Sequence, residues 1–178
     1  GANYPQGFAC PPAGAVLTMD DGTVTHFLGA AQGDPEVCRF SSSAEPPGAP
    51  PATALYGLWN ANSEQAAQAR TALRTLFPPA VGKSAHFDVP SINEFVWRIS
   101  YTMKGRQTLT VPAGRFEVWL IEYEQRGVVG NTFLGRQTFA LADNGMIIRR
   151  EGTVVRGRAP AGSGFVTPPA QAVSIRVP

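Results

Sequence analysis

Histidine, lysine and charged residues in general are scarce in this 178-residue chain. It has two histidines, His26 and His86, and two lysines, and charged side chains make up 16% of the total. Two histidines leave little material for an imidazole-based metal centre. The patterns G-x-S-x-G, H-E-x-x-H and G-x-G-x-x-G are also missing, so we expect no cofactor and no catalytic or metal-binding residues.

Long apolar runs are absent as well. No run of about 18 apolar residues occurs, so we expect no transmembrane span. The first residues, Gly1-Ala2-Asn3, lack the pattern of a signal peptide, and we expect that any export signal has been removed.

Charge is unevenly distributed along the chain. Residues 1–93 carry a net charge of −3 and residues 94–178 one of +5. The arginines are scattered rather than clustered, so nucleic acid is not an expected partner.

Cysteine occurs at two positions, Cys10 and Cys38. No C-x-x-C pair or histidine cluster accompanies them, so nothing indicates a metal site. We expect a disulfide, which would stabilise the fold by roughly 3 to 4 kcal/mol in an oxidising compartment; the alternative is two unrelated buried thiols. The disulfide predicts a periplasmic or extracellular location.

Length and composition indicate a single β-rich domain over residues 1–178. A domain of this size removes about 70% of its unfolded surface from water, and 43% of the residues are hydrophobic. Nineteen glycines and sixteen prolines imply many turns. We expect residues 1–14 and 157–171 to be irregular, and residues 41–53, with four prolines, to form an internal loop.

Residues 62–77 carry the one convincing helical pattern. Asn62 and Gln65 have the spacing of a capping box, and apolar residues follow at intervals of three and four. Pro78-Pro79 ends the pattern, because proline disfavours the helical conformation in the residue before it.

From residue 84 onward the apolar residues follow the period of two that is typical of strands. Residues 95–103 have large apolar side chains at every odd position. Residues 104–106 predict a turn that pairs this strand with residues 107–111, and the Asn-Gly step within 143–145 predicts another hairpin. We therefore predict a mainly β fold (α+β): a curved antiparallel sheet, as in a β-sandwich or half-barrel, with one helix.

Aromatic residues in these strands are candidates for a ligand pocket. A half-open barrel often encloses a space for an apolar ligand, although such side chains more often just fill the core. The candidate ligand-binding residues are Trp97, Tyr101, Trp119 and Tyr123. The strand over residues 116–125 has apolar side chains on both faces, so we expect both sides of it to be covered.

Two rows of polar residues could carry chemistry. Ser84, His86 and Asp88 would point the same way from a strand, in the order of a nucleophile, a base and an acid. Neighbours on one strand face lie about 7 Å apart, however, which is too far for a hydrogen-bonded triad. Glu122 and Glu124 could form a carboxylate pair, but such pairs are more often solvated residues with cross-strand ion pairs.

Residues 111–116 (VPAGRF) and 144–150 (NGMIIRR) resemble those of the TapB-like domains, a group of exported bacterial domains of unknown function. Residues 56–58, 76–79 and 81–84 are similar to that group's pattern too. The resemblance implies a periplasmic or envelope location and a curved antiparallel sheet with a helix, akin to lipoprotein-carrier folds. It implies no catalytic residues.

These observations together favour a non-catalytic envelope protein that binds a partner protein or an apolar small molecule. One alternative is a serine hydrolase that uses residues near His86. Another is a structural accessory subunit of an envelope complex, with the Pro-rich loops as its docking surfaces.

Overall fold

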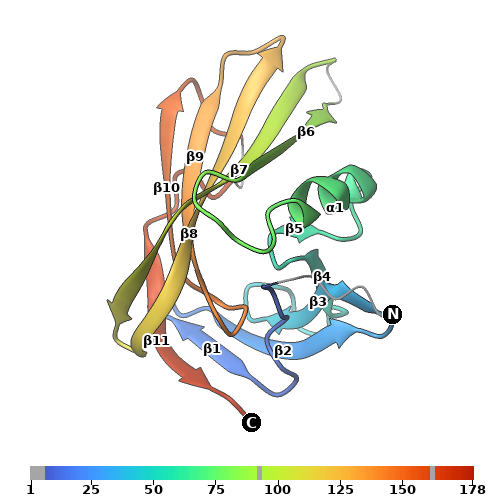
Figure 1. Ribbon diagram of the computed structural model, residues 1–178. Helices are drawn as coiled ribbons and strands as arrows, with labels where there is room; N and C mark the ends of the chain where they lie inside the picture. The colour runs from blue at the N-terminus through green and yellow to red at the C-terminus, as the bar shows by residue number, and fades with distance from the viewer. Residues whose placement is uncertain (1–6, 92–93, 161–162) are drawn as a thin grey trace.

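The computed structural model describes residues 7–91, 94–160 and 163–178 (Figure 1). These residues form one antiparallel sheet of eleven strands in the order β5-β4-β3-β2-β1-β11-β10-β9-β8-β7-β6, and one helix, α1. The elements are β1 (Val16–Met19), β2 (Val24–Ala31), β3 (Asp34–Ser42), β4 (Ala52–Leu55), β5 (Trp59–Asn60), α1 (Ala66–Arg74), β6 (Ser84–Pro90), β7 (Val96–Val111), β8 (Gly114–Val129), β9 (Leu134–Ala142), β10 (Ile147–Arg156) and β11 (Ala170–Arg176).

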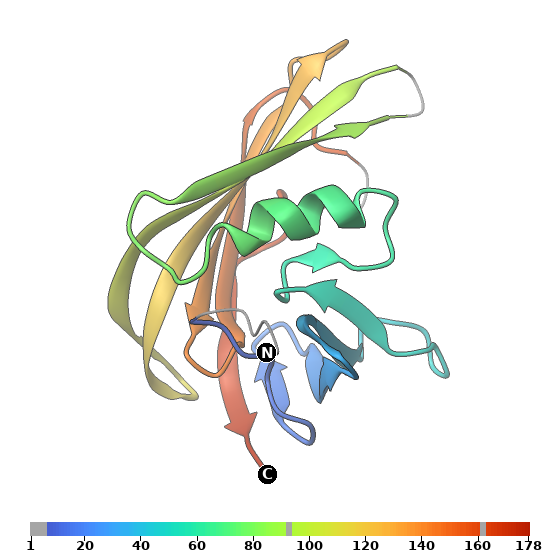
Figure 2. The same cartoon turned by 45° about the vertical axis from the view of Figure 1, so that its right-hand side comes forward.

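The sheet curves so strongly that its two halves face each other, and α1 lies across the concave side (Figure 2). The helix contacts β6 at one edge of the sheet and β4 and β5 at the other. The edges also meet through Trp59 and Phe87, whose ring centroids are 4.9 Å apart. The predicted fold, a mainly β, curved and unclosed antiparallel sheet with one helix, is confirmed.

Strands β7 and β8 are each 16 residues long and pair along their whole length. The turn predicted at residues 104–106 is therefore wrong. The chain continues through a bulge, where the pairing shifts between Met103, opposite Ile121, and Gly105, opposite Leu120. A bulge accommodates one extra residue in a strand without reversing the chain. Polar residues around a glycine occur both in turns and in bulges, so this pattern did not show which of the two forms here.

Apolar side chains cover both faces of β8, as predicted. Ile121 belongs to a core on the concave side that includes Leu73 of α1. Val118 belongs to a second core with residues of β1, β10 and β11. This second core forms because the β7–β8 hairpin folds back onto β11, where the Ala113 amide donates to the Ala172 carbonyl at 3.1 Å.

The predicted helix begins too early. Helix α1 covers Ala66–Arg74, and its cap, Gln65, makes no side-chain hydrogen bond. Asn62, the expected capping residue, instead donates from its side chain to Thr53 Oγ1 at 3.1 Å. A side chain that can bond to a neighbouring strand need not cap a helix, so the capping-box spacing was misleading here. Within the described ranges, no helix is long and apolar enough to span a bilayer.

The irregular segments are shorter than predicted. Strand β3 runs on to Ser42, which pairs with Thr25, and β4 begins at Ala52, which pairs with Phe40, so residues 43–51 remain as the loop. Strand β11 begins at Ala170 rather than after residue 171. Of the predicted irregular segment 1–14, the first six residues lie outside the described part of the chain.

Candidate functional site

A cavity of about 290 Å³ lies between the strands β1 to β3 and the strands β9 and β10. Its lining is mostly apolar and comes from five strands, the loop after β4, the segment before β1 and the turns that join β1 to β2 and β9 to β10. The apolar side chains that line it include Leu17, Met19, Phe27, Phe40, Leu58, Phe139 and Ile147. A concave apolar space with few polar groups has the general character of a small-molecule site.

The strand register explains how these side chains come together. Residues that pair directly across an antiparallel ladder point to the same face of the sheet. Leu17 pairs with Thr25 and Phe27 pairs with Phe40, and all four line the cavity. Strand β1 contributes two side chains at a spacing of two residues, so its inner face becomes one wall of the cavity.

Charge at the cavity is compensated by an ion pair. Arg150 Nη2 lies 2.9 Å from Asp21 Oδ2, and both side chains are partly exposed. A hydrogen bond from the Thr23 amide and the contact with Arg150 both lower the pKa of Asp21. The other polar side chains of the lining are the hydroxyls of Thr23 and Thr25. The site therefore suits an uncharged ligand better than an anion or a cation.

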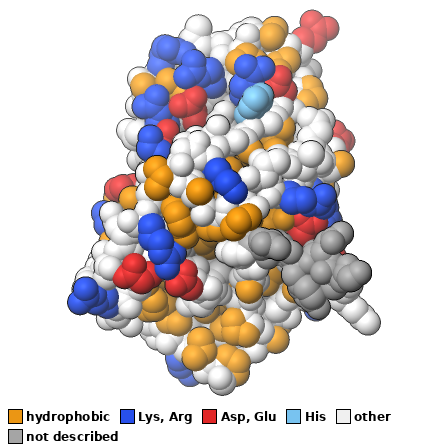
Figure 3. All heavy atoms as spheres, viewed as in Figure 1, with side chains coloured by type: hydrophobic (Ala, Val, Ile, Leu, Met, Phe, Trp, Pro, Cys, Tyr) orange, Lys and Arg blue, Asp and Glu red, His pale blue; other side chains and the backbone are white. Residues whose placement is uncertain are grey.

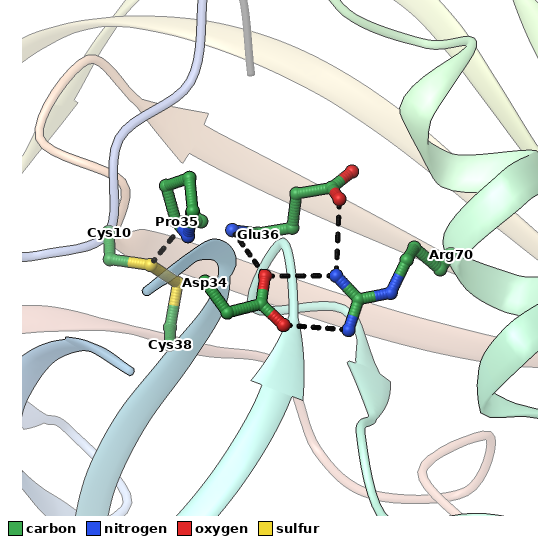
Figure 4. The surroundings of a disulfide bond; sticks show 6 residues. All are labelled: Cys10, Asp34, Pro35, Glu36, Cys38 and Arg70. Atoms are coloured by element: carbon green, nitrogen blue, oxygen red, sulfur yellow. Dashed lines mark hydrogen bonds and ion pairs between the residues drawn. A yellow bond between two sulfur atoms is a disulfide. The ribbon is translucent and has the colours of Figure 1, made fainter. Parts of the chain in front are cut away.

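The disulfide forms part of this wall. Cys10 and Cys38 are joined, with their Cα atoms 5.3 Å apart, and both Cys38 and Pro11 line the cavity. The bond holds the N-terminal segment against β3, beside the acidic residues Asp34 and Glu36 of the same strand (Figure 4).

A cluster of charged residues fastens α1 across the concave side. Arg70 binds the Asp34 carboxylate with two hydrogen bonds of 2.9 and 2.8 Å and Glu36 with one of 3.1 Å (Figure 4). Arg74 binds Glu36 at 2.8 and 2.6 Å, and the Tyr56 hydroxyl donates to the same carboxylate. We call these five residues the helix clamp.

The helix clamp stabilises Glu36 as an anion. Glu36 is 7% exposed. Hydrogen bonds from Arg74, Tyr56 and Arg70 lower its pKa to about 2, against the opposing effect of burial. Burial and the adjacent Glu36 carboxylate raise the pKa of the Tyr56 hydroxyl. The charges bind one another, so the clamp positions the helix rather than offering a reactive group.

Two of the predicted ligand-binding residues, Tyr101 and Tyr123, lie together with ring centroids 5.2 Å apart. Burial raises the pKa of both hydroxyls. Tyr101 is almost completely buried, and its hydroxyl donates to the carbonyl of Leu58 at 3.0 Å. Because Leu58 lines the cavity, Tyr101 supports that wall from behind.

The two predicted tryptophans lie elsewhere. Trp97 packs edge-on against Phe133, with centroids 5.7 Å apart. Trp119 lies beneath the Arg106 guanidinium, 5.6 Å from the ring centroid, and borders a separate hollow of about 330 Å³ with Phe8. None of the four predicted residues lines the 290 Å³ cavity, and their role in binding stays a prediction.

The residues that do line the cavity were missed in the sequence. Leu17 and Met19 alternate with the polar residues Thr18 and Asp20, which correctly indicates an inward face of β1. Nothing local shows that this face lies opposite Phe139 and Ile147, more than a hundred residues further along the chain. The alternation within each strand shows which of its faces is buried, but it does not show which other strand that face packs against.

Ser84, His86 and Asp88 lie in a row on β6, as predicted. Arg98 binds Asp88 with hydrogen bonds of 2.9 and 3.2 Å, and these lower the pKa of Asp88. In the described part of the chain, no hydrogen bond joins His86 to either of the other two residues. A serine hydrolase needs that relay, so the geometry does not favour this alternative.

Glu122 and Glu124 do not form an isolated carboxylate pair. Glu124 lies 3.0 Å from Arg136, its cross-strand partner on β9, and 3.1 Å from Arg126. The two arginines thus give Glu124 the cross-strand ion pairing that the sequence favours over a catalytic carboxylate pair. On the face seen in Figure 3, basic side chains lie beside acidic ones rather than in a continuous stripe.

Among the described residues, no group of three or more His, Cys, Asp or Glu side chains could hold a metal.

Comparison with known proteins gives little further guidance. No family model matches the chain, so membership of the TapB-like domains is not confirmed, and no curated protein matches either. One solved structure is similar over 96% of this chain and 99% of its own, at 16% identity and a TM-score of 0.48: a Bacteroides fragilis protein, thought to be exported, with a YmcC-like fold.

Proposed function

We propose that this protein is a non-catalytic carrier or sensor that holds a small, uncharged apolar ligand on the concave side of its sheet. The observation that carries the proposal is the 290 Å³ cavity, whose walls are aliphatic and aromatic side chains. Ligand pockets in proteins usually measure roughly 300 to 1,000 Å³. The cavity is just below the lower end of that range, which favours a ligand of one or two rings or a short alkyl chain.

We also propose that the protein works in the periplasm or outside the cell, as one domain. Disulfides persist in oxidising compartments, and the Cys10–Cys38 bond supports such a location. A single sheet runs from β5 to β6 through both halves of the chain, which supports one folding unit.

A bulky side chain placed in the cavity should weaken the binding of an apolar probe. Prodan, an uncharged naphthalene probe with two fused rings that fluoresces more strongly in apolar surroundings, is expected to bind the protein. Thr25→Trp places an indole ring in the cavity and should weaken binding by roughly tenfold or more, because the space is then occupied. Fluorescence titration measures the affinity, and thermal unfolding verifies that the variant is folded.

The matched control is Thr25→Val, which keeps the size of the side chain and removes only the hydroxyl. It should bind the probe as the native protein does. If both variants bind equally well, or if the native protein binds no probe, the cavity is not a ligand site.

A second proposal is that the loop between β3 and β4 docks a partner protein, as in an accessory subunit. Every residue from Ser43 to Pro51 is exposed, and four of the nine are prolines. Co-purification at native expression would test this. A partner retained by the whole chain and lost when residues 44–50 are replaced by a short Gly-Ser linker would support docking, whereas equal recovery would contradict it.

A further inference from the structure

A second apolar site on the concave side is filled by the chain itself. Phe165, in the loop before β11, is 3% exposed. Its ring lies 6.0 Å from that of Tyr123, stacked at 18°, and 5.3 Å from that of Phe133, at 67°. Phe165 therefore occupies a seat formed by two aromatic side chains, Tyr123 of β8 and Phe133 in the connection just before β9.

Two glycines make room for this arrangement. A Cβ atom on Gly135 of β9 would lie 2.5 Å from the Phe165 ring, and one on Gly152 of β10 would lie 2.5 Å from the Gly164 carbonyl oxygen. Real Cβ atoms do not approach other atoms so closely, so no other residue fits at either position without a shift. The sheet is thus shaped to receive this ring and the backbone that carries it.

The segment that carries Phe165 is weakly attached. Of residues 163–169, Phe165 is the single buried one, and residues 166–169 are exposed. Among the described residues, no hydrogen bond joins residues 164–169 to the rest of the chain. The Ser163 hydroxyl is buried and has no hydrogen-bond partner within residues 7–91, 94–160 and 163–178. One aromatic ring therefore supplies most of the attachment of residues 163–169, which we call the strap.

An open space beneath the strap shares one lining residue with the cavity. A hollow of about 200 Å³ is lined by Gly164, Thr167 and Pro168 of the strap and by Gln137 and Arg150 of the sheet, among others. Arg150 also lines the 290 Å³ cavity. The seat is linked to the cavity on its aromatic side too, because Tyr123 packs against Phe139, a cavity residue.

We propose that Phe165 is a displaceable plug, and that its seat is a second subsite for an aromatic ring of the ligand. This inference rests on the proposed function and adds to it a ligand class, an uncharged aromatic compound. The incoming ring stacks on Tyr123 as Phe165 does, and the strap lifts away from β9 and β10. Aromatic walls at stacked and edge-on angles favour a flat ring over an alkyl chain.

A covalent lock on the strap tests this inference. A Cβ on Gly164 would lie within 3.2 Å of the side-chain amide of Gln137, so Gln137→Cys with Gly164→Cys places one thiol on the strap and one on the adjacent strand β9. Oxidation, or the short thiol crosslinker dibromobimane, joins them. Peptide mass spectrometry verifies the new bond and the native Cys10–Cys38 bond. Because a reductant would open both bonds, the matched control is the double serine variant, Gln137→Ser with Gly164→Ser.

Indole is the probe, and calorimetric titration gives its affinity. We expect the locked protein to bind indole at least tenfold more weakly than the serine control, and Phe165→Ala to bind it about tenfold more tightly, since the seat is then vacant. Thr25→Trp, which fills the cavity and leaves the seat, separates the two sites.

Each outcome decides between the proposals. Binding lost in the locked protein and kept in Thr25→Trp supports the plug and shows that indole occupies the seat, while the cavity site is tested separately by the fluorescent probe. Binding lost in Thr25→Trp and unchanged in the locked protein overturns the plug and leaves the cavity site standing. If no variant binds indole, the plug is overturned as well.

Discussion

Replacing Cys10 and Cys38 together by serine is expected to lower the free energy of unfolding by roughly 3 to 4 kcal/mol. The two residues are 28 positions apart, and the loop they close contains β1, β2 and the first half of β3. Without the bond the unfolded chain gains conformational freedom, while the folded state changes little. For a chain of this length the melting temperature should fall by about 10 °C, measured by calorimetry.

Reductant provides the control for this prediction. A reductant should shift the native protein to the melting temperature of the double serine variant and leave the variant itself unchanged. If the native protein and the double serine variant were equally stable, the disulfide would not stabilise the fold, and the prediction would be wrong.

Glu36→Gln is expected to lower the free energy of unfolding by about 3 kcal/mol at neutral pH, because the carboxylate is buried and holds both arginines of the helix clamp. A fall in pKa from 4.5 to about 2 corresponds to that amount. The amide keeps the shape of the side chain but leaves Arg70 and Arg74 without their shared anion. Urea unfolding followed by tryptophan fluorescence measures the loss.

The same residue sets a pH window. The pKa of Glu36 is lower in the folded state, so the folded state retains the charge more strongly than the unfolded chain does. Its contribution is complete above pH 4.5 and is lost as the pH falls towards 2. The difference in stability between the native protein and Glu36→Gln should therefore shrink across that interval, and a constant difference from pH 7 to pH 2 would contradict the clamp.

An exposed ion pair serves as the comparison. Asp88 and Arg98 form a bidentate pair on β6 and β7, but each side chain is more than 40% exposed. Asp88→Asn should change the stability by less than about 1 kcal/mol, since water screens and replaces such contacts. A loss as large as that of Glu36→Gln would show that burial does not distinguish the two pairs.

The hairpins show how much of the fold local chemistry predicts. The hairpin predicted at the Asn-Gly step within residues 143–145 is present, and Gly145 has a φ value of 83°, a conformation that glycine adopts without strain. Gly22, in the turn between β1 and β2, has a similar φ value of 88°. The turn predicted around Gly105 is absent, because pairing of β7 with β8 over 16 residues outweighs the local preference. The capping pattern at Asn62 failed for a similar reason, since its side chain binds Thr53 on a strand.

The candidate site was less predictable than the fold. The aromatic residues chosen from the sequence include Tyr101 and Tyr123, which lie next to the cavity and the plug without lining the cavity. Phe165 lies in a segment that the sequence predicts to be irregular, and in such a segment no alternation of apolar and polar residues indicates that one side chain is buried. Arg70 and Arg74 are four residues apart on one helical face, but their acidic partners lie 34 to 38 residues earlier.

Local sequence is enough to predict the period-two strands, the glycine turns and a mainly β fold, because these depend on side-chain alternation and on backbone conformations available within a few residues. Long-range packing sets which strand faces enclose a space, which acids fasten the helix and which ring fills the seat. Those features depend on the curvature of the sheet, which brings β1 to β3 opposite β9 and β10 and so joins residues that no local pattern relates.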